Sequence, residues 1–316
     1  MTPSMLSSLE TLRCVVREMR THEDIVLLPI LLGITNSSTG TFVELGAFDG
    51  ISGSQTYLLE RCFGWRGLLI EASPINFAQL EVTPRAPQTR KVHSAVCATR
   101  GGTVSMISSG GTVAGVLDDL GSRRIFRGKK HFRNCSAVQC VTDVPCKPLP
   151  ALMEDAGLPR VNFLSLDVEG SEERVLQSVL KSAASLPFDV VMVEADGMTP
   201  AKDERVRGLL RGAGMRRLPL AQYTGSVNEL YAQAHVADPR RPLGKEADAA
   251  AYRELKAGWL KPALRSMPRS PYLVEQMNIT TTSLIVKWLM ASMPDAFEEW
   301  KRIESSRSGR SRRRRD

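Results

Sequence analysis

The sequence contains no apolar run long enough to span a lipid bilayer, which takes about 20 residues of α-helix. The best candidate, residues 25–34, is short and contains Pro29, and the acidic residues Glu23 and Asp24 precede it. A signal peptide would instead start with basic residues and end at a small-residue cleavage site. We therefore expect no transmembrane segment, but a helix that is broken near Pro29.

Cysteine is scarce as well, with six in 316 residues, too few for the disulfide framework of a small secreted domain. Three of them cluster without the histidines that would complete a zinc motif: Cys135, Cys140 and Cys146. We expect the other three to be buried as small apolar residues: Cys14, Cys62 and Cys97. The expected location is cytosolic by default, since glycosylation sequons such as the one at Asn36 matter only in the secretory route.

What the sequence does contain is an acidic turn after an apolar strand, in residues 41–50 (TFVELGAFDG). Glu44 stands just before the turn, and Gly46 permits a close backbone approach. Asp49 and Gly50 complete the turn. A turn that binds phosphates would present glycines and bare N–H groups, whereas two carboxylates would repel a diphosphate. The turn favours a nucleoside without phosphates and with a cationic end, and S-adenosylmethionine fits that description.

A second strand, residues 67–71 (GLLIE), supports this interpretation because it ends in Glu71. In strand–helix–strand nucleoside sites, an acid at the end of the second strand accepts both ribose hydroxyls. Residues 54–63 carry apolar side chains at helical spacing and supply the crossover helix. We expect Ala72 and Ser73 to follow under the edge of the adenine ring.

These motifs resemble the opening half of the FkbM-type family of S-adenosylmethionine-dependent methyltransferases. Residues 161–171 (VNFLSLDVEGS) resemble the second hallmark of that family, a strand that ends in Asp-Val-Glu-Gly. Residues 190–197 and 227–231 resemble its next strand and its closing strand. The match covers roughly residues 40–235 and keeps the motif order. It implies a methyltransferase, in a family largely associated with O-methylation of sugars, polyketides and other small metabolites.

The predicted fold class is α/β, with strands and helices that alternate along the chain. The resemblance implies a Rossmann-like, seven-stranded methyltransferase sheet that is mostly parallel and has an antiparallel last strand. We expect strands near residues 41–45, 67–71, 91–97, 161–167, 188–194, 215–220 and 227–233. We expect helices near residues 54–63, 74–82, 148–156, 171–183 and 201–213.

The predicted organisation has four parts. Residues 1–38 form an N-terminal helical segment that packs over the cofactor edge, and residues 39–235 form the methyltransferase domain. An irregular insertion at about residues 99–140 carries glycines and a basic run, so it is a candidate cover for the substrate. Residues 236–306 are expected to be a helical extension, and residues 307–316 a basic disordered tail or nuclear-import signal.

The roles of the site residues follow from their expected position at the carboxyl ends of the strands, because ligands of open α/β sheets bind there. Glu44 and Gly46 are expected on the methionine and ribose side of the cofactor. Asp167 is expected to face the region of methyl transfer and is the preferred base, since an alcohol is a poor nucleophile while protonated. Glu169 is expected to cap the neighbouring turn or to position the acceptor.

Other candidates for the base are Glu169, His93 and His131, and a structural role is the better interpretation of His93. Asp167 and Asp196 offer a further possibility, because together they could hold Mg²⁺. Glu194 and Glu229 complete the acidic rim, whose mutual repulsion a bound cation would relieve.

Three alternatives compete with a small-molecule methyltransferase. A nicotinamide-dependent oxidoreductase needs a Gly-x-Gly-x-x-Gly turn, which the sequence lacks. A nucleic-acid base methyltransferase commonly carries Asn/Asp-Pro-Pro-aromatic where this chain has Asp-Val-Glu-Gly, and an acidic rim disfavours a polyanion. The alternative that stays open is a non-catalytic binding or trafficking protein on a methyltransferase fold. We expect a small-molecule or glycan acceptor and no nucleic acid.

Overall fold

The computed structural model describes residues 14–15, 18, 20–21, 23–35, 39–98, 101–108, 114–119, 141–183, 185–218 and 227–236. The predicted helical extension, apart from its first residue, and the basic tail lie outside the described residues. The same is true of His131, Cys135 and Cys140 in the insertion and of the sequon residue Asn36.

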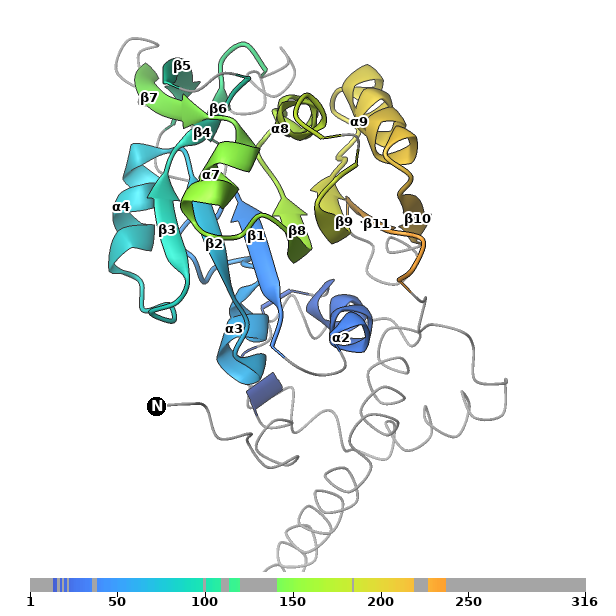
Figure 1. Cartoon of the computed structure of the whole chain (residues 1–316). Coiled ribbons are helices and arrows are strands. Elements are labelled where there is room, and N and C mark those ends of the chain that lie inside the picture. The colour runs from blue at the N-terminus through green and yellow to red at the C-terminus, as the bar shows by residue number, and fades with distance from the viewer. Residues whose placement is uncertain are drawn as a thin grey trace, which may run out of the picture.

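A seven-stranded sheet forms the centre of the fold (Figure 1). Its parallel strands are β1 (Thr41–Leu45), β2 (Arg66–Glu71), β3 (Arg90–His93), β8 (Val161–Leu166) and β9 (Phe188–Glu194). The last strand, β11 (Asn228–Ala232), is antiparallel to β9 and to β10 (Arg216–Leu218). The order is β10-β11-β9-β8-β1-β2-β3, which confirms the predicted seven-stranded, mostly parallel sheet.

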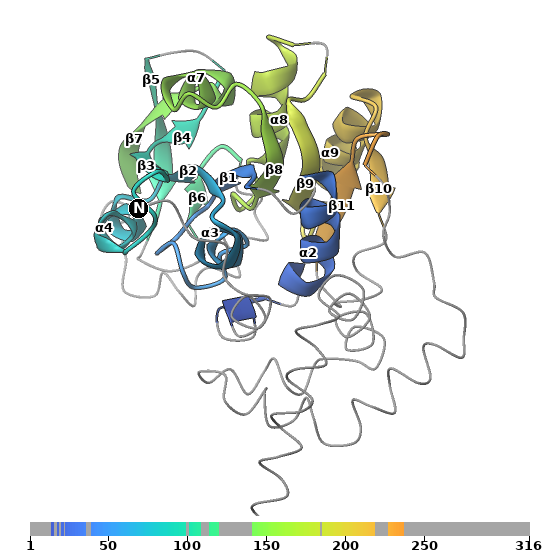
Figure 2. The ribbon, with the colours of Figure 1, turned by 60° about the horizontal axis from the view of Figure 1, so that its bottom comes forward.

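Helices cover both faces of this sheet, as Figure 2 shows. One face carries α2 (Glu23–Ile34), α3 (Tyr57–Phe63) and α4 (Pro74–Val82). The other carries α7 (Leu149–Asp155), α8 (Glu172–Leu180) and α9 (Pro200–Gly212). Side chains alternate along each strand, so Phe42 and Phe163 pack in one hydrophobic cluster while Val43 and Leu164 pack in the other. Because both faces are buried, the central strands have nearly continuous apolar sequences.

Helix α2 runs through Pro29, so the expected break there is wrong. A reciprocal cap precedes the helix: Thr21 Oγ1 accepts the N–H of Asp24 at 3.3 Å, and Asp24 Oδ2 accepts the N–H of Thr21 at 3.0 Å. Burial raises the pKa of Asp24 to about 7. This end of α2 lies at the carboxyl rim of the sheet, where Asn228 Nδ2 donates to Glu23 Oε1 at 3.2 Å. Among the described residues, no helix is long and apolar enough to cross a membrane.

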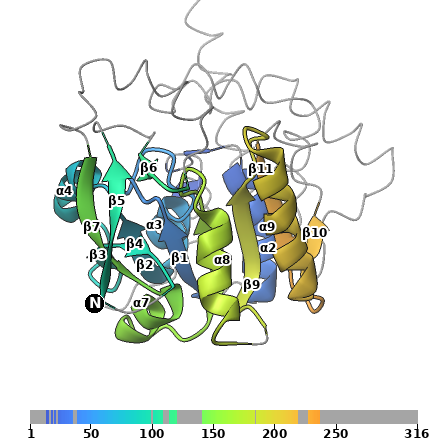
Figure 3. The ribbon, with the colours of Figure 1, turned by 90° about the horizontal axis from the view of Figure 1, so that it is seen from above.

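Within the insertion, the described residues form two of the four strands of a second sheet. Its strands are β4 (Ala95–Val96), β5 (Gly102–Ile107), β6 (Gly115–Val116) and β7 (Val141–Lys147), in the order β4-β7-β5-β6. The single strand expected at residues 91–97 is thereby divided between two sheets, β3 in one and β4 in the other. Figure 3 shows the second sheet beside β3 and α4, at the end of the molecule opposite β10.

Two disulfides correct the expectation of free buried cysteines. Cys14 is bonded to Cys62, and Cys97 is bonded to Cys146. The second bond lies within the small hydrophobic cluster of the second sheet, beside Met106. The pairs are far apart in the sequence, so spacing alone could not identify them.

We predict that each disulfide stabilises the protein by a similar amount, since the paired residues are 48 and 49 positions apart and the loops that they close in the unfolded chain are nearly equal. Replacing either pair by serines should lower the free energy of unfolding by about 2–4 kcal/mol. Urea unfolding of the two double variants would measure this. Peptide mapping under non-reducing conditions should recover both linked pairs, and free thiols at these positions would contradict the assignment.

Candidate active site at the carboxyl edge of the sheet

A pocket opens where β1, β2 and β8 end. Its walls come from residues at these strand ends, from the second sheet and from the start of α8. Of the predicted site residues, five line it: Gly46, Glu71, Ala72, Asp167 and Glu169. The other four are not among the lining residues: Glu44, Asp49, Gly50 and Ser73. These four residues make hydrogen bonds to residues that form or adjoin the pocket wall.

Gly46 is required by a close approach of two strand ends. Its backbone is in the left-handed region, with φ of 77°. A Cβ atom there would lie 1.8 Å from the carbonyl oxygen of Asp167. The sequence pattern indicated close approach of a ligand, but the group that approaches is the neighbouring backbone. The N–H groups of Gly46 and Ala47 both donate to the carbonyl of Ile70, which holds the turn against β2.

Glu71 is fixed by the backbone on both of its oxygens. Oε2 accepts the N–H of Phe48 at 2.8 Å, and Oε1 accepts the N–H of Ser73 at 2.7 Å. Burial nevertheless raises the pKa of Glu71 above its usual range. Each carboxylate oxygen can accept more than one hydrogen bond, so the group can still receive hydroxyls from the pocket. Phe48 adopts a φ of 49°, and this directs its N–H to the acid.

Glu44 faces the loop that follows β1 and is not a lining residue of the pocket. It is buried and accepts hydrogen bonds from Ser54 Oγ at 2.8 Å, from Gln55 N–H at 2.9 Å and from Thr56 Oγ1 at 2.5 Å. Asp49 also organises this loop, because its carboxylate accepts the N–H groups of residues 51 and 52. These two acids therefore shape the wall of the pocket.

Ser73 and Ala72 join the pocket to α4 and to the second sheet. Ser73 Oγ caps α4 by accepting the N–H of Asn76 at 3.3 Å and lies 2.6 Å from Ser108 Oγ. His93 Nε2 lies 3.0 Å from the carbonyl oxygen of Ala72, and the ring stacks on Phe77. His93 is not among the residues that line the pocket, which agrees with the expected structural role.

The turn after β8 presents Asp167 and Glu169 to the pocket. Glu169 has a φ of 55°, and Gly170 has a φ of 109°. Glu172 Oε1 holds this turn by accepting the N–H groups of Val168 and Gly170, both at 3.1 Å. Asp167 is exposed, so a substrate can reach its carboxylate.

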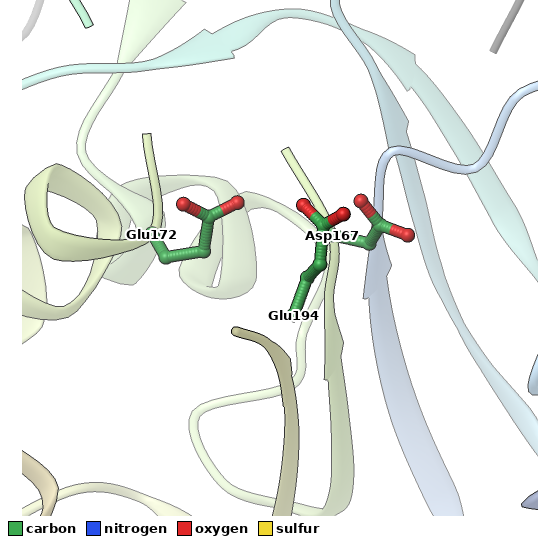
Figure 4. A group of neighbouring side chains, drawn as sticks. All are labelled: Asp167, Glu172 and Glu194. Atoms are coloured by element: carbon green, nitrogen blue, oxygen red, sulfur yellow. The ribbon is translucent and has the colours of Figure 1, made fainter. Parts of the chain in front are cut away.

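The acidic rim is arranged differently from the expected Asp167–Asp196 pair. Carboxylate oxygens of Asp167, Glu172 and Glu194 lie within 4.8 Å of one another (Figure 4). Asp196 is not in this group, and its Oδ1 accepts the N–H of Met198 at 2.9 Å. Glu229 is buried and ion-paired with two arginines, Arg207 and Arg217, each at 2.8 Å.

The second sheet forms a roof over the pocket, through Met106 of β5 and residues 114–116 in and beside β6. Asp119 fastens this roof to the opposite wall. Its carboxylate accepts Ser171 Oγ at 2.7 Å and pairs with Arg174 Nε at 2.7 Å. Lys202 Nζ also donates to the backbone carbonyls of Asp119 and Gly170. Sequence analysis missed Asp119, because nothing near it in the sequence identifies its partners.

The sequence of residues 44–216 matches the family model described as the methyltransferase FkbM domain. This chain belongs to the FkbM methyltransferase family. A similar solved structure is methyltransferase FkbM from Methylobacillus flagellatus KT, with 16% sequence identity and a TM-score of 0.36. The similarity covers 61% of this chain and 43% of that one, so the chain spans less than half the length of that protein. No curated protein matches the sequence.

We predict that Asp119→Ala loosens the roof, because it removes the ion pair with Arg174 and the hydrogen bond with Ser171. Hydrogen exchange should accelerate severalfold at the amides of Leu117 and Asp119, which bond within the roof. Asp143→Ala is the control, since Asp143 is an exposed acid of the same sheet that bonds to Ser105. Equal exchange at residues 114–119 in both variants would contradict the role of Asp119.

Proposed function

We propose that the protein is an S-adenosylmethionine-dependent O-methyltransferase that acts on a hydroxyl of a small metabolite or sugar. The observation that carries the proposal is Glu71, a buried carboxylate that two backbone N–H groups hold at the pocket wall. An acid in this position suits ribose hydroxyls and would repel a phosphate. Membership of the FkbM family supports methyl transfer as the chemistry.

The pocket residues fit the parts of this cofactor. Glu71 would receive the ribose hydroxyls, while Ala72 and the roof residues Met106 and Val116 offer apolar surface to the adenine ring. Near Gly46 and Asp167 the pocket wall carries negative charge, which suits the sulfonium and ammonium groups. When bound, the cofactor supplies an activated methyl group.

Asp167 would act as the base. It would accept the proton of the acceptor hydroxyl as the oxygen of that hydroxyl bonds to the methyl carbon, while the carbon–sulfur bond of the cofactor would break and S-adenosylhomocysteine would leave. The transfer is an in-line displacement, so correct placement of the acceptor contributes much of the acceleration. Glu169, on the same turn, would position the acceptor. The acidic wall favours a neutral, hydroxylated acceptor such as a sugar over a polyanion, in line with the expectation of no nucleic acid.

For the compartment, we propose an oxidising one in place of the cytosolic default. The two disulfides support this proposal because cytosolic thiols are kept reduced. A Mg²⁺ requirement stays a prediction, and among the described residues Asp167, Glu172 and Glu194 have carboxylate oxygens close enough to share the ion.

We predict that Glu71→Ala weakens the binding of S-adenosylmethionine at least tenfold, because a hydrogen bond to a charged group contributes about 1.5–3 kcal/mol. Calorimetric titration with S-adenosylmethionine and S-adenosylhomocysteine would measure the affinity. Glu81→Ala is the control, since Glu81 is exposed on α4. Unchanged affinity in Glu71→Ala would remove the ribose assignment. A folded wild-type protein that binds neither compound would favour the alternative of a non-catalytic binding protein.

We predict that Asp167→Asn lowers turnover about 10²–10⁴-fold and changes cofactor affinity far less, because the amide cannot take the proton. Turnover would be followed as release of S-adenosylhomocysteine, with an acceptor found by screening sugars and small alcohols, with and without Mg²⁺. Asp196→Asn is the matched control, because Asp196 does not line the pocket. Wild-type turnover in Asp167→Asn would exclude it as the base.

A further inference from the structure

Arg85 is an arginine whose side chain is fully buried, and nothing in the motifs of the cofactor site accounts for it. Its side chain is 0% exposed, and it lies in the connection between α4 and β3. Burying a guanidinium is costly unless its donors are satisfied, so a buried arginine indicates a site with a defined set of partners. Its partners lie mostly in the loop that follows β1.

The guanidinium donates to three residues of that loop, Gly50, Ser54 and Thr56, with the bond to Ser54 the longest at 3.5 Å. Nη1 donates to the carbonyl of Gly50 at 2.7 Å, and Nη2 donates to Thr56 Oγ1 at 3.1 Å. Nε donates to Glu60 Oε1 at 3.0 Å, and that carboxylate is 1% exposed. The planar fork of the guanidinium can bond to all of these partners at once, which the ammonium of a lysine cannot reproduce.

The bond to Thr56 connects Arg85 to the acid of the β1 motif. Thr56 Oγ1 accepts from Arg85 and donates to Glu44 Oε2 at 2.5 Å. Ser54 Oγ makes a longer link between the same two groups, because it accepts from Arg85 Nη1 at 3.5 Å and donates to Glu44 Oε2 at 2.8 Å. The buried guanidinium and the buried carboxylate are therefore joined through two hydroxyls, and that of Thr56 lies closer to both groups. A second contact from the same connection reinforces the loop, because Thr83 Oγ1 donates to the carbonyl of Asp49 at 2.7 Å.

The same loop forms part of the pocket wall. Phe48, Ser52 and Gly53 line the pocket, and Phe48 supplies the N–H that holds Glu71. The contacts of Arg85 lie at Gly50, Ser54 and Thr56, on either side of Ser52 and Gly53. The loop therefore has a pocket side and a buried side, and Arg85 holds the buried side.

We propose that Arg85 is a positioning residue for the cofactor: it fixes the loop of residues 48–56 in the conformation that binds S-adenosylmethionine, acting through Thr56 and Gly50. The inference rests on the proposed function for the identity of the cofactor. Order in the loop is a property of the protein without ligand and can be measured separately.

The test compares two buried threonines that each donate to a buried glutamate at 2.5 Å. Thr56→Val removes the shorter of the two hydroxyl links between Arg85 and Glu44, whereas Thr89→Val removes a hydroxyl that donates to Glu60 Oε2 and belongs to neither link. Hydrogen exchange of residues 48–56 in the free protein reports loop order. Calorimetry reports affinity for S-adenosylmethionine, and thermal unfolding reports stability.

We expect Thr56→Val to accelerate loop exchange and to weaken cofactor binding about tenfold, and Thr56→Ser to restore both, because serine keeps the hydroxyl. Thr89→Val should lower the melting temperature comparably and leave loop exchange and affinity near wild type. If Thr56→Val does not fold, Thr83→Val probes the same loop through the carbonyl of Asp49.

The outcomes distinguish the positioning role of Arg85 from the proposed function. If the wild type binds the cofactor and Thr56→Val matches Thr89→Val in exchange and affinity, the positioning role is wrong. If the wild type does not bind the cofactor and loop exchange still rises only in Thr56→Val, the ordering role of Arg85 stands and the proposed function fails.

Discussion

The close contact between Gly46 and the backbone of Asp167 is the constraint on which the rest of the site depends. A side chain at residue 46 would collide with the carbonyl of Asp167, so only glycine lets the ends of β1 and β8 meet. That contact brings the acidic turn after β1 next to the turn after β8, and it leaves the pocket between them. Glu71, at the end of β2, completes the wall because the turn at Gly46 also bonds to β2.

Buried charged side chains hold the loop that forms part of the pocket wall. Glu44, Glu60 and Arg85 are all removed from water, and each keeps its hydrogen bonds. Such groups stabilise little in total, because their attraction must offset the loss of hydration. The loop conformation in the structure satisfies hydrogen bonds of all three groups. A loop that is already ordered loses less conformational entropy when a ligand binds.

The motifs of the central strands do not predict the second sheet. It brings Met106 and Val116 over the pocket, and Asp119 ties it to the wall formed by α8. The Cys97–Cys146 disulfide lies in the core of the same sheet. The disulfide thus links the end of β4 to β7 within the second sheet, and the ion pair of Asp119 with Arg174 holds this sheet to α8.

Local patterns in the sequence predict the strands of the central sheet and most of the helices, whereas the antiparallel closing strand is implied by the resemblance to the FkbM family. Apolar strands and helical spacing are local patterns, and the acids at the strand ends follow directly from them. The sequence also identified Gly46, Glu71, Ala72, Asp167 and Glu169, all of which line the pocket.

Which acids face the pocket and which face the interior depends on the tertiary structure. Glu44 and Asp49 belong to the same motif as Gly46, but their carboxylates bond within their own loop. The partners of Arg85 and Asp119, the disulfides and the second sheet all join residues far apart in the chain. Contacts of that kind depend on how the elements pack in space, and no local spacing encodes them.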